Sequence, residues 1–97
     1  MRVISRKALR EFREKHSDAR QPLQAWCADV EHADWKSPSD IKNVYRNAGF
    51  LANNRVVFNI KGNRCRVVVA VQYKYSIVYI RFVGAHQEYD KIDAAAI

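Results

Sequence analysis

Hydrophobic positions recur at helical spacing in the first half of the chain and alternate in the second half. A short β-branched strand at residues 2–5 is followed by a charged segment, 6–16, whose apolar residues share one face, which predicts a surface helix. A second helix is expected to begin near residue 18 and to end near residue 35. Its apolar stripe, at i, i+3, i+4 and i+7, consists of Leu23, Trp26, Cys27 and Val30.

A third helix has a clear start signal in the "SPSD" of residues 37–40. Ser37 is the expected cap and Pro38 takes the first helical position, where its missing N–H costs nothing. This helix is predicted to stop near Gly49. Residues 50–54 are then expected to form the loop that leads into a sheet.

Three strands are predicted in the second half, at residues 55–60, 64–73 and 76–83, because all three segments are rich in β-branched and aromatic residues. The connections at 61–63 and 74–76 are short enough for consecutive antiparallel hairpins. The order of elements is therefore a strand, helices, three strands and a polar helical tail.

Strict alternation assigns the residues of each strand to two faces, one apolar and one that carries arginines. In the last strand, Val78, Ile80 and Phe82 are expected to share a face. The apolar side of the sheet is expected to receive the helices. The predicted fold is a single α+β domain over residues 1–97, with the N-terminal strand and helices packed on one face of a small, mainly antiparallel sheet and a short C-terminal helix.

The positive charge of the chain is concentrated in one region. The formal net charge is +7, yet residues 1–35 are nearly balanced, with seven Lys/Arg against six Asp/Glu. Residues 41–87 contain no Asp or Glu at all. A field of one sign over such a length favours a polyanionic partner, and nucleic acid is the commonest one. The eight cations of this stretch are Lys42, Arg46, Arg55, Lys61, Arg64, Arg66, Lys74 and Arg81.

Other function classes receive no support from the sequence. The N-terminus has no long apolar run and the longest apolar segment is "VVVAV", so neither a signal peptide nor a membrane span is expected, and a cytoplasmic location is. Cys27 and Cys65 do not have the spacing of metal ligands, and they are expected to be reduced and buried. No metal and no cofactor is expected.

Two segments carry a resemblance to a known family. "RVVFNIKGNRCRVVVAV" followed by "YIRFVGAHQEYDKIDA" resembles the HigB toxins of bacterial toxin–antitoxin pairs, within the wider RelE/ParE-like superfamily. The likeness extends over nearly the whole chain, although Ala85 and Cys65 stand where other residue types are usual. Its most specific parts are the GNxxR spacing and the HxEYD run, which comprise Gly62, Asn63, Arg66, His86, Glu88, Tyr89 and Asp90.

The resemblance implies a RelE-like fold and an endoribonuclease that cuts mRNA, for many members only on the translating ribosome. The implied partners are mRNA, the ribosome at its A site with the 16S rRNA, and a cognate HigA antitoxin of the helix-turn-helix type. These partners follow from the family alone, because composition and spacing indicate only a basic, acid-free sheet with a polar C-terminal edge.

RNA cleavage without a metal requires a base for the 2′-OH, cations for the phosphorane and an acid for the leaving 5′-oxygen. His86 suits proton transfer at neutral pH, and Asp90, four residues on, can orient or charge it. Tyr89 can stack on a base or donate a proton through its hydroxyl. Which of the three is the base and which is the acid stays open.

Arg66 is the candidate cation for the phosphorane, because guanidinium forks match phosphate oxygens. Further candidate contacts with RNA or its phosphates are Lys61, Asn63, Arg64, Arg81 and Lys91.

Each of these assignments has a structural alternative. His86 can simply cap a helix, and Asp90 and Asp93 can simply favour the N-terminus of a last helix. Two other functions also stay open: a ParE-like toxin that inhibits a protein target such as DNA gyrase, and a basic RNA-binding module without catalysis. The base specificity of cleavage is not readable from the sequence.

Overall fold

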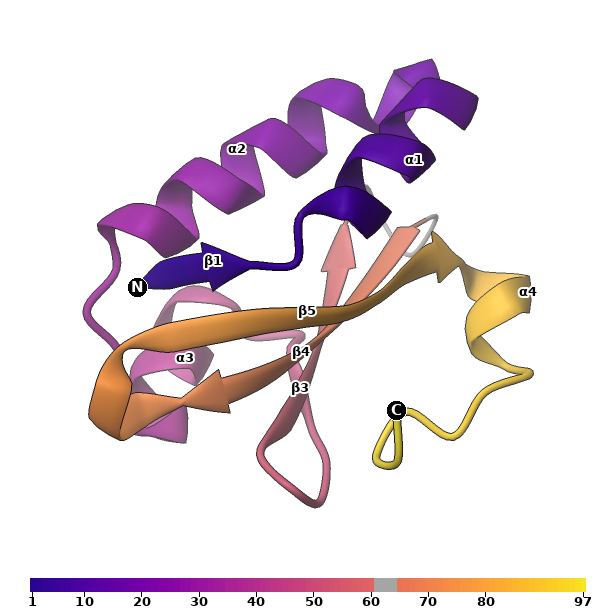
Figure 1. Cartoon of the computed structure of the whole chain (residues 1–97). Helices are drawn as coiled ribbons and strands as arrows, with labels where there is room; N and C mark the ends of the chain where they lie inside the picture. The colour runs from indigo at the N-terminus through magenta and orange to yellow at the C-terminus, as the bar shows by residue number, and fades with distance from the viewer. Residues whose placement is uncertain (61–64) are drawn as a thin grey trace.

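The computed structural model describes residues 1–60 and 65–97 and has an α+β fold, as predicted (Figure 1). Two 3₁₀ turns, Ser17–Ala19 and Tyr73–Tyr75, supplement the regular elements. The regular elements are β1 (Arg2–Ile4), α1 (Lys7–Lys15), α2 (Arg20–His32), α3 (Pro38–Val44), β2 (Gly49–Phe50), β3 (Arg55–Ile60), β4 (Cys65–Gln72), β5 (Ile77–Ala85) and α4 (His86–Tyr89).

The strands form one sheet in the order β1-β5-β4-β3-β2. β1 runs parallel to β5, and every other neighbouring pair is antiparallel, which confirms the predicted, mainly antiparallel sheet. The strand β2 was not predicted. It is only two residues long and pairs with Val56 and Val57 of β3, so its existence depends on a neighbouring strand rather than on a local pattern. The predicted turn at residues 61–63 lies outside the described residues.

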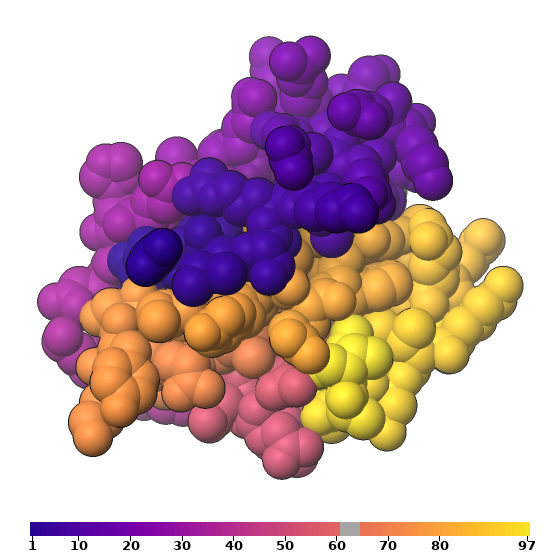
Figure 2. Space-filling view, in the orientation of Figure 1, coloured from indigo at the N-terminus to yellow at the C-terminus, as the bar shows by residue number. Residues whose placement is uncertain are grey.

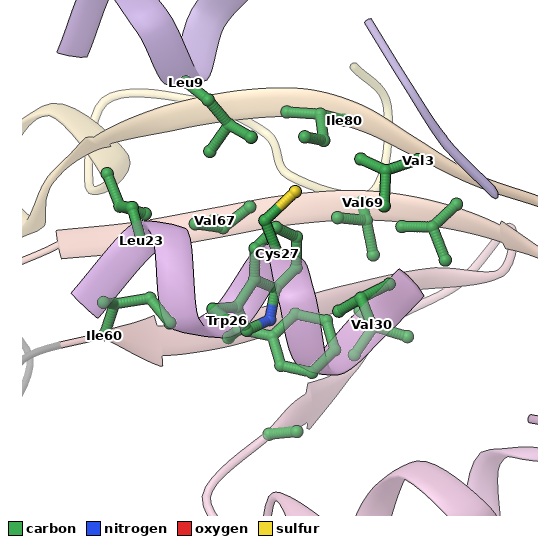
Figure 3. Packing of buried hydrophobic residues seen from close by; sticks show 14 of the residues in the cluster. Val3, Leu9, Leu23, Trp26, Cys27, Val30, Ile60, Val67, Val69 and Ile80 are labelled. Atoms are coloured by element: carbon green, nitrogen blue, oxygen red, sulfur yellow. The ribbon is translucent and has the colours of Figure 1, made fainter. Parts of the chain in front are cut away.

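The predicted helical stripe forms the core. Leu23, Trp26 and Val30 of α2 are 2% exposed or less, and Figure 3 shows them beside β4, the strand that carries Val67 and Val69. Cys27 is buried in the same stripe, and both cysteines are free, as expected. The apolar residues recur with the 3.6-residue period of a helix, so they share the side of α2 that packs against the sheet.

One part of the predicted face assignment is wrong. The register of β4 with β5 changes from Val68–Phe82 to Val69–Ile80, so Arg81 is an extra residue without a partner of its own. Such a β-bulge reverses the alternation on one side of itself. Phe82 consequently leaves the face of Ile80 and joins Val68 in a second, smaller cluster.

The C-terminal segment covers this second face of the sheet. Ala94 is buried against Val57 and Val68. The side chain of Asn53 donates to the Ala95 carbonyl over 3.1 Å, and Arg55 Nε donates to the main-chain oxygen of Ile97 over 2.9 Å. Figure 2 shows the resulting contact, with the yellow C-terminal residues against the pink turn before β3. The sheet is thus packed on both faces, by helices on one and by the C-terminal segment on the other.

Because the bulge turns Phe82 toward the face of Gly84, we expect that a larger residue at position 84 would destabilise the fold. A Cβ at position 84 would lie 2.5 Å from Cζ of Phe82, whereas a Cβ at Gly49 would meet nothing closer than Val57 Cβ at 3.8 Å. Gly84→Ala is therefore expected to lower the free energy of unfolding in urea by about 1–3 kcal/mol, and Gly49→Ala by much less. In a Phe82→Leu background the cost of Gly84→Ala should shrink. Equal costs for both glycines in both backgrounds would contradict this packing.

The buried thiol of Cys65 predicts a loss of stability in alkali. Burial, followed by the negative charges of Glu88 and Asp18, raises the pKa of Cys65 from 9.0 to about 12. Because the folded-state pKa is the higher one, this stabilisation is complete below pH 9 and is lost as the pH rises toward 12. Burial also raises the pKa of Tyr45 from 10.0 to about 12. The free energy of unfolding in denaturant should therefore fall less between pH 8 and 11 for Cys65→Ala than for the wild type. The part of the decline that comes from Tyr45 should remain in the variant. Identical slopes of free energy against pH would contradict the burial of the thiol.

Candidate functional site

The pairing of β4 with β5 brings two distant parts of the chain together at one end of the sheet. Arg66, near the start of β4, is the register partner of Gly84, near the end of β5. The helix α4 begins two residues later, at His86. Figure 1 shows α4 at the tip of β5, beside the beginning of β4. A cation on one strand thus lies next to the helix that follows the other.

The guanidinium of Arg66 stacks on Tyr89. Its Cζ lies 4.6 Å from the centre of the Tyr89 ring. Opposite Arg66, Gly84 has no side chain, and the ring of Phe82 reaches into the space that a Cβ there would take. A cation held against a ring face keeps the edge of its N–H fork available for an anion.

His86 and Asp90 form a pair on the same side of α4, as their spacing predicts. The distance from His86 Nε2 to Asp90 Oδ2 is 3.6 Å, and the two side chains are 52% and 58% exposed. This separation exceeds that of a normal hydrogen bond, and an exposed ion pair contributes little to stability. The arrangement therefore leaves the imidazole accessible, with a carboxylate beside it.

The other acids of this region serve the backbone. Glu88 Oε1 accepts a hydrogen bond from the Ala85 N–H over 3.2 Å, at the entrance of α4. Asp93 Oδ1 accepts from the Ala95 N–H over 3.2 Å, in the C-terminal segment. Asp93 was expected to favour the N-terminus of a last helix, but it instead stabilises a turn in the C-terminal segment.

The remaining candidate contacts with RNA divide into two groups. Arg81 is exposed at the bulge, and Lys91 is exposed directly after Asp90. Lys61, Asn63 and Arg64 lie outside the described residues. Among the described residues, no hydrogen bond or ion pair joins Arg81 to the cluster formed by Arg66, His86, Tyr89 and Asp90.

Two cations of the acid-free stretch have structural partners instead. Arg55 holds the C-terminal segment through Ile97 and also donates to the Asn53 carbonyl over 2.9 Å. Lys42 donates to the Ala48 carbonyl over 3.1 Å and lies 5.9 Å from the centre of the Phe50 ring. The number of cations in the sequence therefore overstates how many are available to bind another molecule.

Asn59 is a residue that the sequence reading did not single out. It is the register partner of Arg66 on β3, and its Nδ2 donates to the Asn47 carbonyl over 3.1 Å. Its Oδ1 and the Nε of Arg66 are both sealed from solvent without a hydrogen-bond partner. Such a group costs about 1–3 kcal/mol when left unpaired. The signal that could have revealed Asn59 is a polar residue between Phe58 and Ile60 in an otherwise apolar strand.

A larger cavity lies elsewhere in the described structure. It has a volume of about 480 Å³, lies between α1 and α2 and shares no lining residue with the cluster around Arg66. Three of its titratable groups are already engaged, since Glu31 pairs with Arg6 at 2.8 Å and His32 Nδ1 lies 2.8 Å from the Ala28 carbonyl. The chemistry therefore points to the sheet edge and not to this cavity.

Residues 1–60 and 65–97 lack two further features. Within those residues, no group of three or more His, Cys, Asp or Glu side chains is arranged to hold a metal ion. No helix of the described chain has the length and apolar character needed to cross a membrane.

The chain matches a family model over residues 19–92. The model is described as HigB_toxin, the RelE-like toxic component of a toxin–antitoxin system.

Curated relatives agree with this match. The chain is 34% identical over 93 residues to the mRNA interferase toxin HigB of Escherichia coli K12, which covers 93% of this chain and 88% of the relative. The mRNA interferase HigB of Shigella flexneri matches to the same extent. The mRNA interferase HigB of Escherichia coli O6:H1 is 22% identical over 94 residues, covering 95% of this chain and 91% of the relative.

The stacking of Arg66 on Tyr89 predicts different results for two substitutions. Tyr89→Phe keeps the ring, so the side-chain protons of Arg66 should retain their ring-current shifts in NMR spectra. Tyr89→Leu removes the ring and should abolish those shifts, at a stability cost of about 0.5–1 kcal/mol for the lost cation–π contact. Unchanged Arg66 shifts in Tyr89→Leu would show that the two side chains do not stack in solution.

Proposed function

Because the chain belongs to the HigB family of RelE-like toxic components of toxin–antitoxin systems, we propose that it is an endoribonuclease that cleaves mRNA. The Escherichia coli K12 and Shigella flexneri relatives bear the name mRNA interferase, and we transfer that activity to this chain. The observation that carries the proposal is the placement of Arg66, a phosphate-binding cation, against Tyr89 and beside the His86–Asp90 pair.

The proposed step is attack by the ribose 2′-oxygen on the adjacent phosphorus. A base removes the proton of the 2′-OH, the bond from phosphorus to the 5′-oxygen breaks, and an acid protonates the departing oxygen. The products are a 2′,3′-cyclic phosphate and a 5′-hydroxyl, and no water or metal ion is consumed. His86, Tyr89 and Asp90 are the candidates for the two proton transfers, and the assignment of base and acid among them stays open.

Arg66 is proposed to stabilise the phosphorane. Charge builds up on the non-bridging oxygens in the transition state, and a pre-positioned guanidinium stabilises that charge without having to reorganise. Stacking on Tyr89 occupies the face of the guanidinium, so its remaining N–H groups can point toward phosphate oxygens. Tyr89 is thereby a support for Arg66 as well as a candidate proton donor.

The finer partners are proposals of the same kind. We expect the substrate to be mRNA on the translating ribosome, bound in the cytoplasm at the A site beside 16S rRNA. The exposed Arg81 and Lys91, together with Lys61, Asn63 and Arg64, are proposed to contact RNA or its phosphates. The antitoxin that neutralises the toxin is proposed to be a HigA-like helix-turn-helix protein.

Substitution of the cluster tests this function directly. His86→Ala and Arg66→Ala should each reduce cleavage of cellular transcripts by about 100-fold or more, since acid–base and oxyanion groups contribute on that scale. The same variants should relieve growth arrest on expression. Cleavage is measured by primer extension after induction, with circular dichroism to verify the fold of each variant.

His16→Ala provides the matched control, because His16 is an exposed histidine that stacks on Phe12 of α1 and is not a member of the cluster. It should arrest growth and cut transcripts as the wild type does. Intact transcripts together with DNA damage after wild-type induction would instead indicate a ParE-like target, and intact transcripts with RNA binding would indicate a non-catalytic module.

A further inference from the structure

A small polar pocket lies at the open end of β3, away from the larger cavity between the helices. It has a volume of about 200 Å³ and is formed by residues 44–48 together with Phe58 and Asn59. Arg46 is exposed at this pocket and is the one charged residue among the described residues that line it. A pocket below the range of about 300–1,000 Å³ typical of drug-sized ligands has room only for a small group.

Asn59 connects this pocket to the cluster around Arg66. Asn59, Arg66 and Gly84 are register partners on β3, β4 and β5, so they form one row across the sheet. Neighbouring strands are about 4.8 Å apart, so the pocket begins one strand away from the arginine proposed to hold the reacting phosphate. A strand of RNA that crosses the sheet along this row would pass from α4 to the pocket.

The hydrogen bonding of Asn59 is incomplete in a way that suits a ligand. One end of its amide is fixed, since Nδ2 donates to the Asn47 carbonyl over 3.1 Å. Its Oδ1 has no partner and is sealed from solvent. The second N–H of Nδ2 is a further donor to a bound group. The terminal torsion of an asparagine is soft, so a ligand that replaces the bond to Asn47 can also rotate Oδ1 outward as an acceptor.

We propose that this pocket binds one nucleobase of the RNA strand, adjacent to the cleaved bond, with Asn59 reading the edge of the base and Arg46 contacting a phosphate. Unstacked bases in single-stranded RNA offer paired donors and acceptors, which a carboxamide matches with both of its ends. The absence of carboxylates among the lining residues 44–48, 58 and 59 suits a polyanion. The identity of the strand as a substrate rests on the proposed ribonuclease function.

The two residues should have separable effects. Asn59 contacts the base, so its substitution should change which sequences are cut. Arg46 contacts a phosphate, so Arg46→Gln should weaken the binding of all sequences alike and raise KM with little effect on kcat.

Binding can be tested without turnover. The probes are RNA trinucleotides with 2′-O-methyl groups, which lack the attacking hydroxyl, added to ¹⁵N-labelled His86→Ala protein. The side-chain amide signals of Asn59 should shift on addition of at least one trinucleotide, and Asn59→Ala should weaken that complex by about tenfold. If no trinucleotide shifts the Asn59 or Arg46 signals, the pocket is not a base-binding site.

Cleavage tests the specificity. Positions of cutting by wild type, Asn59→Ala and Asn59→Asp are mapped by sequencing RNA ends from an in vitro translation reaction. Asn59→Ala should relax the base preference at one position by about tenfold, and Asn59→Asp, which keeps an acceptor but loses both donors, should shift it. The control is Asn43→Ala, an exposed residue of α3 outside the pocket, which should leave the pattern unchanged.

The failures of the two ideas are distinguishable. A wild-type protein that cuts no RNA overturns the ribonuclease function, while the trinucleotide titration still decides the pocket. A wild-type protein that cuts RNA, with an identical pattern in both Asn59 variants, overturns the base-binding pocket and leaves the ribonuclease function standing.

Discussion

The antiparallel pairing of β4 with β5 is the constraint on which the rest of the structure depends. It places Arg66 opposite Gly84 and so beside the helix that carries His86, Tyr89 and Asp90. The bulge at Arg81 shifts this pairing by one residue, and without it the side chains beyond Phe82 would exchange faces. A register error of one residue would therefore separate the phosphate-binding cation from the proton-transfer groups.

The two faces of the sheet divide the work between stability and chemistry. One face is covered by α1 and α2, whose apolar stripes pack against the buried side chains of the strands to form the main core. The other face receives the C-terminal segment, which Arg55 and Asn53 fasten to the turn before β3. The cluster of Arg66 and Tyr89 lies at the margin of this second layer, where packing ends and solvent begins. A site in that position is held by the fold while it stays open to a long polymeric substrate.

The parts that the sequence predicted well are those with a strong local period. The stripe from Leu23 to Val30 and the spacing of His86 and Asp90 are both set by helix geometry, so short stretches of sequence suffice for them. The parts that it missed depend on long-range register. Phe82 changes face because of a bulge that no glycine marks, and the stacking of Arg66 on Tyr89 joins residues from β4 and α4. The position of Asn59 beside Arg66 follows from the register between β3 and β4, which a single strand of sequence does not contain. Whether Lys61, Asn63 and Arg64 approach the site stays a prediction from the sequence.

The chemistry of the RNA ends is the most direct test of the proposed site, because it reports which oxygen attacks the phosphorus. Purified protein would be added to ribosomes translating a defined mRNA, and both new ends would be identified by enzymatic treatment and mass spectrometry. Attack by the 2′-oxygen, with His86, Tyr89 and Asp90 transferring protons beside Arg66, predicts a 2′,3′-cyclic phosphate (or the 2′- or 3′-phosphate formed when it opens) and a 5′-hydroxyl. A 3′-hydroxyl together with a 5′-phosphate would mean that water attacks instead, and would contradict this mechanism.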